Sequence, residues 1–322
     1  MRLKLVPDHT EYDFFKYRTV TFGFSAVLMV ISLALWLTVG LNFGIDFRGG
    51  TTIRTQAEQP MDVGSYRDAI APLELGDVSI SEVFDPTFAA DTHVAMIRIQ
   101  AQDGEESVSA DTVQSVEEAL QELDETIRFT SVESVGPKVS GELIQTAVLA
   151  VAAALAAILF YIWLRFEWQF SVGAVAALFH DVVLTIGIFS ALQIRFDLAT
   201  IAALLTIIGY SINDTVVIFD RLRENLRKFK TKPLRDVMNL SVNETLSRTL
   251  MTSGTTLIAL IALLVLGGDV IRGFVFAIFW GVIVGTYSSV YVAKNVVLWL
   301  GVKRDWSKPT DTTGNQFANI DA

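Results

Sequence analysis

Six long apolar segments dominate the chain and are separated by shorter polar ones. A helix rises 1.5 Å per residue, so about 20 apolar residues cross the ~30 Å hydrocarbon core of a bilayer. Segments of this length lie at 19–40, 143–164, 170–192, 198–219, 249–267 and 274–298. The pattern therefore predicts six transmembrane helices. The first is expected to be retained, because it is long for a signal peptide and follows a flank with four basic residues.

The region between the first two apolar segments, residues 41–141, is patterned and too long for a plain connection. Alternation with period two predicts strands at 51–56, 77–84, 93–100 and 127–135, and helical spacing predicts helices at 62–75 and 110–125. Ser109 is the expected N-cap of the second helix. The order β-α-β-β-α-β is that of a ferredoxin-like α+β domain, and its acidic residues are expected to form a solvated face.

Composition fits a membrane protein with a polar insert and narrows its chemistry. The 322 residues are 52% hydrophobic and 19% charged. The chain has no cysteine, which excludes disulfides and thiol chemistry, and its three histidines, His9, His93 and His180, are far apart. We therefore expect neither a metal site nor a cofactor. A net charge of −10 weighs against nucleic acid as a partner.

Lysine and arginine concentrate on one side of the predicted membrane, which fixes the orientation. The basic residues of that side are Arg2, Lys4, Lys16, Arg18, Arg165, Arg221, Arg223, Arg227, Lys228, Lys230, Lys232, Arg235, Arg248, Lys294, Lys303, Arg304 and Lys308. The tails 1–18 and 301–322 are therefore expected in the cytoplasm. The 41–141 domain is expected outside, followed by helices two to six within 142–300.

Asn213 and Asp214 lie inside the fourth apolar segment, about five residues from its cytoplasmic end. An ionisable group inside a membrane is costly, so it is a functional candidate by default, and a buried carboxylate can carry a proton. Tyr210 lies one turn away on the same face. Alternatively, Asp214 marks the interface and the span is shorter, but the apolar residues 216–219 that follow weaken this interpretation.

Arg248 opens the fifth apolar segment and is the candidate cation for Asp214. With Thr252 and Thr256 it forms a polar stripe at i, i+4 and i+8. Side chains tilt toward the N-terminus of their helix, so Arg248 and Asp214 lean apart, and a pair that forms in only one conformation would suit a switch. The alternative is that Arg248 is an ordinary cytoplasmic anchor.

Two further features of the spans stand out. His180 and Asp181 lie near the middle of the third span, where a structural pair and a proton relay are equally compatible with the sequence. The sixth span carries small residues at every fourth position, namely Ala277, Gly281, Gly285, Ser289 and Ala293. Small residues allow close helix approach, so this stripe is expected to pack against another helix, in this chain or in a partner.

No pattern in the sequence indicates an enzyme. The GxxxxGK[ST] phosphate loop is absent, and no nucleophile–histidine arrangement is visible. If the protein does work, an ion gradient is the natural source of energy, because moving one charge across ~100 mV yields ~2.3 kcal/mol.

Several segments, in order along the chain, resemble the SecD/SecF family of bacterial protein-export membrane proteins. They are LNFGIDFRGGTT (41–52), VGPKVSGEL (135–143), YIWLRFEWQFSVGAVAALFHDVVLTIGIFSAL (161–192), GYSINDTVVIFDRLREN (209–225) and SVNETLSRTLMTSGTTL (241–257). The resemblance extends from about residue 15 to 300. One six-span unit with a short outer domain resembles the smaller member of the family, since SecD has a much larger outer region.

The resemblance implies a subunit that pairs with SecD in a pseudo-symmetric twelve-span complex of the RND superfamily in the bacterial inner membrane. Its implied partners are the SecYEG channel, YajC, the translocating preprotein and membrane lipids. Such complexes use the proton-motive force to assist export without ATP. In them the residues at the positions of Asp214 and Arg248 are implicated in proton passage, with weaker support for Asp181.

Gly49 and Gly50, which follow the first span, would form either a hinge to the outer domain or a simple connector. Two other functions are kept as alternatives to export. The chain could be half of an RND-type exporter of lipids or small molecules, although its outer domain has no evident aromatic groove. It could also be a structural scaffold for the channel, in which case neutralising Asp214 would leave activity intact.

Overall fold

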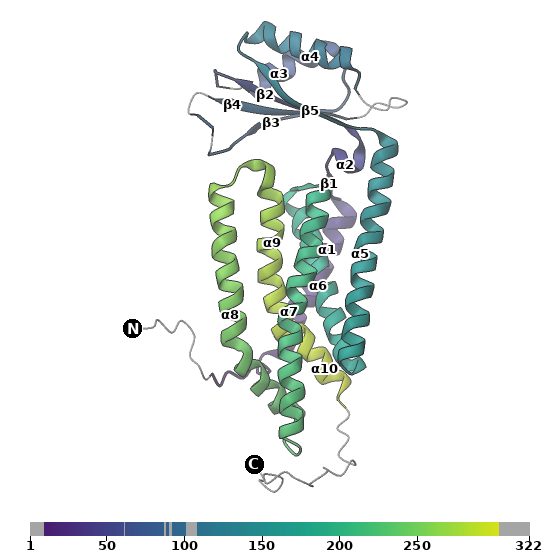
Figure 1. Cartoon of the computed structure of the whole chain (residues 1–322), viewed down its shortest axis with the longest axis vertical. Coiled ribbons are helices and arrows are strands. Elements are labelled where there is room, and N and C mark those ends of the chain that lie inside the picture. Colours follow the sequence, from purple (N-terminus) through teal and green to yellow (C-terminus); the bar gives the residue numbers. More distant parts are fainter. Residues whose placement is uncertain (1–9, 61, 87, 90–91, 101–107, 303–322) are drawn as a thin grey trace, which may run out of the picture.

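A helical bundle carries a small sheet domain at one of its ends (Figure 1). The computed structural model describes residues 10–60, 62–86, 88–89, 92–100 and 108–302. The tails predicted at 1–18 and 301–322 thus lie largely outside the described residues.

Six helices in the described residues are long and apolar enough to cross a membrane. They are α1 (Arg18–Thr38), α5 (Pro137–Arg165), α6 (Trp168–Leu192), α7 (Leu198–Lys228), α8 (Leu234–Leu266) and the run Asp269–Leu300. That last run consists of α9 (Asp269–Ser288), the π-helical turn η2 (Ser289–Ala293) and α10 (Lys294–Leu300). The predicted polytopic helical fold is confirmed. Helices α7 and α8 extend past the apolar segments, since Arg, Lys, Glu and Leu continue a helix beyond the hydrocarbon.

The sheet domain contains four strands and two helices in the predicted order. They are β2 (Gly50–Ala57), α3 (Val63–Ile70), β3 (Val78–Val83), β4 (His93–Gln100), α4 (Ala110–Leu123) and β5 (Arg128–Val135). All neighbouring strands are antiparallel, in the spatial order β3-β4-β2-β5. The ferredoxin-like prediction is confirmed. Helix α3 ends earlier than predicted, where a 3₁₀ turn, η1 (Ala71–Leu73), contains Pro72.

The two faces of this sheet differ in chemistry. Helices α3 and α4 cover one face (Figure 1), where Ile53, Ile97 and Val116 are fully buried. Residues on the opposite face include Thr52 of β2, which is paired with Arg98 of β4. This second face is turned toward the helical bundle and is rich in polar and charged side chains.

A pair of two-residue strands that the sequence did not reveal joins the sheet domain to the bundle. Strand β1 (Asn42–Phe43) pairs in parallel with β6 (Arg195–Phe196), which lies between α6 and α7, and the short helix α2 (Ile45–Arg48) follows β1. Two residues are too few to produce an alternation signal. Gly49 and Gly50 then have φ angles of 74° and 127°, a region that favours glycine. They form a tight turn into β2; a hinge role stays a prediction.

The core of the bundle is built around α6, α7 and α9. Phe170, Phe189 and Phe219 are fully buried there. Helices α1 and α5 lie at the periphery and expose many large apolar side chains, as expected for surfaces that face lipid or another subunit. The bundle thus has an interior that is sealed by its own helices and an apolar exterior.

Lys294 is a fully buried basic residue near the end of the last span. The sequence analysis counted it among the basic residues of the cytoplasmic side, and in the structure its side chain is 0% exposed. Its Nζ lies 4.1 Å from the ring centroid of Phe15 and 4.9 Å from that of Phe14, in the segment before α1. The N-terminal segment folds back over α10 and covers this residue, a contact that no local pattern predicts. Cation–π contacts partly replace the water that Lys294 loses.

Candidate functional site

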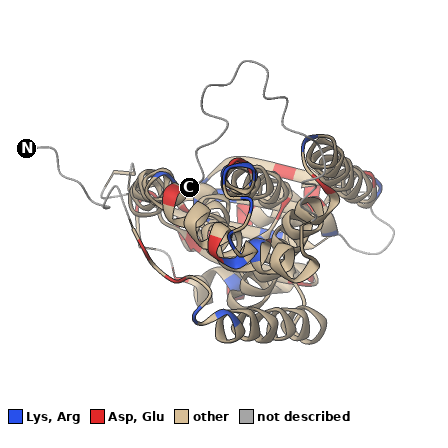
Figure 2. Cartoon of the chain, turned by 90° about the horizontal axis from the view of Figure 1, so that it is seen from below, with Lys and Arg blue, Asp and Glu red and all other residues tan. Residues whose placement is uncertain are grey.

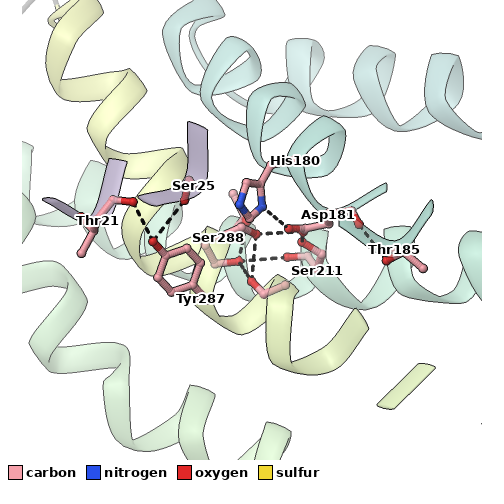
Figure 3. Close-up of polar contacts among 11 residues, drawn as sticks. Thr21, Ser25, His180, Asp181, Thr185, Ser211, Tyr287 and Ser288 are labelled. Atoms are coloured by element: carbon pink, nitrogen blue, oxygen red, sulfur yellow. Dashed lines mark hydrogen bonds and ion pairs between the residues drawn. The ribbon is translucent and has the colours of Figure 1, made fainter. Parts of the chain in front are cut away.

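The interior of the bundle contains a polar cluster in which both oxygens of Asp181 of α6 are hydrogen-bonded, whereas the Nε2 atom of His180 has no partner in the described residues (Figure 3). Asp181 Oδ2 accepts hydrogen bonds from Ser211 of α7 at 2.6 Å and from Ser288 of α9 at 2.8 Å. Its other oxygen lies 2.9 Å from His180 Nδ1. Asp181 and His180 are each 1% exposed. One carboxylate thus connects three helices in the middle of the bundle.

This cluster extends to the peripheral helix α1. The His180 ring stacks on Tyr287 at 6.0 Å between centroids. The Tyr287 hydroxyl donates to the Thr21 carbonyl at 2.9 Å and lies 3.1 Å from Ser25 Oγ (Figure 3). Polar contacts therefore link α1 to α6 and α9, and the position of α1 depends on the same cluster.

Asp214 of α7 is buried in a very different way. Its side chain is 3% exposed, yet its Oδ2 has no hydrogen-bond partner within the described part of the chain. Neighbouring Asn213 points outward and is exposed. Thr215 instead points inward, where its Oγ1 lies 2.8 Å from Ser289 Oγ. Asp214 is thus a desolvated carboxylate with spare accepting capacity at the edge of the bundle interior.

Arg248 is near Asp214 but makes no direct ion pair with it among the described residues. Arg248 is exposed at the surface of α8 and lines a cavity of about 440 Å³. Val217, one turn after Asp214, lines the same cavity. A polar opening from the end of the bundle opposite the sheet therefore reaches within one helical turn of the buried carboxylate.

Ion pairs surround this opening. Arg221 contacts Glu244 at 2.7 Å and Glu224 at 2.6 Å, and Arg165 contacts Asp220 at 2.7 Å. Figure 2 views this end of the molecule, with basic segments in blue and acidic ones in red. Asp220 of α7 is thus paired with the end of α5.

The predicted polar stripe on α8 is only partly involved in interhelical contacts. The Thr252 hydroxyl donates to the carbonyl of Arg248 in its own helix, and Thr252 is exposed. Thr256 Oγ1 donates to the Thr252 carbonyl at 2.9 Å and accepts a long hydrogen bond, 3.4 Å, from Tyr210 of α7. The stripe therefore runs along the outer surface of this chain.

The small-residue stripe of the sixth span packs inside this chain. Its five members are all buried: Ala277, Gly281, Gly285, Ser289 and Ala293. A Cβ added at Gly281 would overlap the side chain of Ile207 on α7, and one at Gly285 would lie 3.0 Å from Ser211 Cβ. The sequence left open whether the stripe packs against a helix of this chain or of another protein. In the structure, Gly281 and Gly285 pack against helix α7 of this chain. The stripe lets α9 approach α7 closely enough for Ser288 and Ser289 to reach the polar cluster.

Sequence reasoning missed the hydroxyl partners in this interior. Ser211, Thr215 and Ser288 are almost fully buried; the two serines donate to Asp181, and Thr215 contacts Ser289. Ser211 and Thr215 are four residues apart, like the stripe they face on α9, so matching the two helical faces could have found them. The π-helical turn η2 begins at Ser289, beside these contacts; such turns often occur at functional sites.

The remaining acids at the ends of spans have local roles. The Asp197 carboxylate accepts from the Thr200 amide at 2.9 Å and forms a capping box that starts α7. Asp269 accepts from the Phe84 amide of the sheet domain at 2.6 Å. In the described residues no group of three or more His, Asp or Glu side chains is placed to hold a metal ion.

Comparisons with known families match most of the chain. The family model described as protein export membrane protein SecD/SecF, C-terminal, matches residues 115–303. The model described as SecD/SecF GG motif matches residues 34–61, which include Gly49 and Gly50.

Curated relatives and solved structures agree with these matches. The chain is 68% identical to the protein translocase subunit SecF of Cereibacter sphaeroides, with 100% of this chain and 99% of the relative covered. It is 62% identical to the same subunit of Rhodobacter capsulatus, with 99% and 97% covered.

A crystal structure of SecDF from Thermus, described as a translocon-associated membrane protein, superimposes with a TM-score of 0.81 at 34% identity. A SecDF structure in a super-membrane-facing form gives 0.68 at 36% identity. In both cases 93% of this chain is covered, and the chain spans 40% of the length of the SecDF chain. With its six membrane helices, its sheet domain and these matches, the chain belongs to the SecD/SecF family of protein-export membrane proteins.

Proposed function

We propose that this chain acts in protein translocation as the SecF-type subunit, and that Asp214 carries the proton that couples export to the proton-motive force. The supporting observation is the buried Asp214 carboxylate, whose Oδ2 has no hydrogen-bond partner in the described residues. A carboxylate held in this way has no neighbour that commits it to one protonation state. The cavity beside Arg248 provides proton access from the end of the bundle opposite the sheet.

Arg248 and its stripe have a separate role in this proposal. Arg248, Asn213 and Thr252 are exposed on the surface of this chain. In a complex with SecD, that surface is covered, and the charge of Arg248 then acts on Asp214 in an environment with less water. Movement of α8 relative to α7 changes that interaction and so drives uptake and release of the proton.

Asp181 holds the helices in place and does not carry the travelling proton. Its carboxylate already accepts from two serines and contacts His180. Proton exchange at Asp181 would disrupt contacts to α7 and α9 at once. The cluster thus holds α6, α7 and α9 together, and α8 can move against them.

The proposal also sets orientation and partners. The sheet domain faces the periplasm and both termini the cytoplasm of a bacterial inner membrane, because basic residues gather at the opposite end. The apolar exteriors of α1 and α5 fit contacts with SecD or lipid. SecYEG, YajC and the translocating preprotein are the further partners.

The test is a secretion assay in cells depleted of the native protein and complemented with Asp214→Asn. This change removes the titratable proton and nearly preserves shape. We expect export to fall to the level of depleted cells while co-purification with SecD persists. Asp236→Asn is the control, since Asp236 is an exposed acid in the first turn of α8 and does not line the cavity beside Arg248; it should support normal export. Normal export with Asp214→Asn would favour the scaffold function.

A further inference from the structure

A cavity of about 680 Å³ separates the sheet domain from the bundle. Its roof is the face of the sheet that α3 and α4 leave uncovered, and its floor is formed by the ends of α7, α8 and α9 nearest the sheet. The proton pathway proposed above lies toward the other end of the bundle. The cavity therefore needs an explanation of its own.

Three arginines line the cavity, two of them on the sheet and the third on β6 at the end of the bundle. The Nε atoms of Arg54, Arg98 and Arg195 are buried and have no hydrogen-bond partner within the described residues. Arg98 donates to the thioether sulfur of Met96 at 3.1 Å, and Arg195 lies 3.9 Å from the same sulfur. A thioether is a weak acceptor. Burial, followed by the charge of Arg195, lowers the pKa of Arg98 to about 10.

The acids around the cavity are largely committed to other groups. Asp46 accepts from the Leu198 amide at 3.0 Å, and Asp197 caps α7. Asp269 accepts from the Phe84 amide and pairs with Arg272. Asp197 Oδ2 lies 3.8 Å from Arg195 Nε, too far for a hydrogen bond.

Two more carboxylates, Glu82 and Glu133, are exposed in the solvent-accessible part of the lining. They add negative charge to the cavity but do not bond the three Nε atoms. The interior of the cavity therefore has spare hydrogen-bond donors on guanidinium groups, arranged to bind an anion.

The bundle side of the cavity combines charged residues with apolar side chains at the point where two spans end. Leu264 lies in the last turn of α8, and Val270 and Phe274 belong to the first turns of α9. Apolar side chains at the end of a span lie at the level where acyl chains meet headgroups. An occupant with an anionic group at one end and hydrocarbon at the other fits both the arginines and these apolar side chains.

We propose that this cavity binds the phosphate group of a phospholipid from the leaflet on the sheet side. The phosphate oxygens accept hydrogen bonds from Arg98 and Arg195, and the glycerol and acyl chains lie against Leu264 and Phe274. The bound lipid then joins the sheet domain to the bundle. Free phosphate would satisfy the arginines and leave the apolar side chains uncovered.

Native mass spectrometry of the full-length protein in detergent tests this site. Phosphatidylglycerol is titrated beside diacylglycerol with the same acyl chains, which lacks the phosphate. Wild type should retain phosphatidylglycerol at least about tenfold more tightly, as expected for charge-assisted hydrogen bonds. Arg98→Gln should lose most of this difference. Arg67→Gln, an exposed arginine of the sheet domain that does not line the cavity, should keep it.

Further experiments distinguish the phospholipid from other occupants of the cavity. Arg195→Gln removes the guanidinium group on the bundle side, and it tests the same lipid preference if Arg98→Gln does not fold. Equal lipid preference in wild type and both variants overturns the proposal. Inorganic phosphate that displaces phosphatidylglycerol at equal concentration would show a free-anion pocket instead. Displacement of the lipid by an acidic peptide at lower concentration would show a polypeptide site.

Discussion

Asp181 and Asp214 are the same residue type, are nearly equally buried, and lie in one bundle, yet their surroundings are opposite. Asp181 contacts three side chains from three helices, all within 2.9 Å. Asp214 has an oxygen with no partner in the described residues, and an open cavity begins one turn away. Burial alone therefore does not identify a proton carrier. The two aspartates differ in whether neighbouring side chains already donate hydrogen bonds to the carboxylate.

We expect Asp181 and Asp214 to have different roles inside the bundle. A saturated carboxylate fixes helix positions, because moving any one helix breaks contacts to the others. An unsaturated one stores free energy that protonation or an approaching cation can release. The two regions can be separated experimentally by measuring stability and export on the same variants.

The largest expected effect is on stability, for Asp181→Ala. It removes three contacts and leaves the Ser211 hydroxyl without its acceptor, whereas the Ser288 hydroxyl keeps the Gly285 carbonyl at 3.1 Å. Interhelical hydrogen bonds in membranes average ~0.6 kcal/mol, and an unsatisfied buried group costs about 1–3 kcal/mol, so we expect a loss of roughly 2–4 kcal/mol. Unfolding in mixed micelles measures it. Asp214→Ala should cost clearly less, and equal losses would remove the distinction between the two sites.

A second, intermediate effect concerns the packing that holds the polar cluster around Asp181 together. Gly281→Ala adds a methyl group that overlaps Ile207, and overpacking of this kind costs about 1–3 kcal/mol. The matched control is Gly254→Ala in α8, where a Cβ would meet nothing within 4 Å. That change should be neutral or slightly stabilising. If both substitutions behave alike in the same unfolding assay, close packing of α7 and α9 does not set the stability of the bundle.

The smallest expected effect on stability is that of Arg248→Gln. Arg248 is exposed in this chain and makes no direct ion pair among the described residues, so the free energy of unfolding should change by less than ~0.5 kcal/mol. Export, in contrast, should fall strongly, because the proposed proton carrier loses its cation. Complementation assays on the variant, with protein levels checked by immunoblot, measure this. A stable variant with full export would make Arg248 an ordinary anchor.

Much of the fold could be predicted from the sequence, because membrane spans and alternating strands are set by local patterns. Apolar length predicted the six spans, and alternation predicted β2, β3, β4 and β5 closely. Hydropathy could not predict how far α7 and α8 extend, because a helix continues where the hydrocarbon ends. The β1–β6 pair and the covering of Lys294 by Phe14 and Phe15 depend on residues that are distant in sequence.

The candidate site was predictable in part. Asp214 and Asp181 stand out as ionisable residues within apolar segments, so their importance could be inferred. Their different surroundings could not, since serine and threonine hydroxyls barely alter an apolar pattern. Whether Ser211 faces Asp181 or solvent is decided by the rotation of α7 against α9, which the packing at Gly281 and Gly285 fixes.

The π-helical turn at Ser289–Ala293 has a consequence for the register of the last span. A π turn accommodates one residue more than an α turn, and each residue of an α-helix corresponds to about 100° of rotation. The extra residue therefore sets the rotation of α10 about its own axis, and with it the direction in which Lys294 points. Deleting a single residue here would shift every later side chain around the helix axis. The side chains of α10 therefore depend on this turn in the interior of the span for their positions.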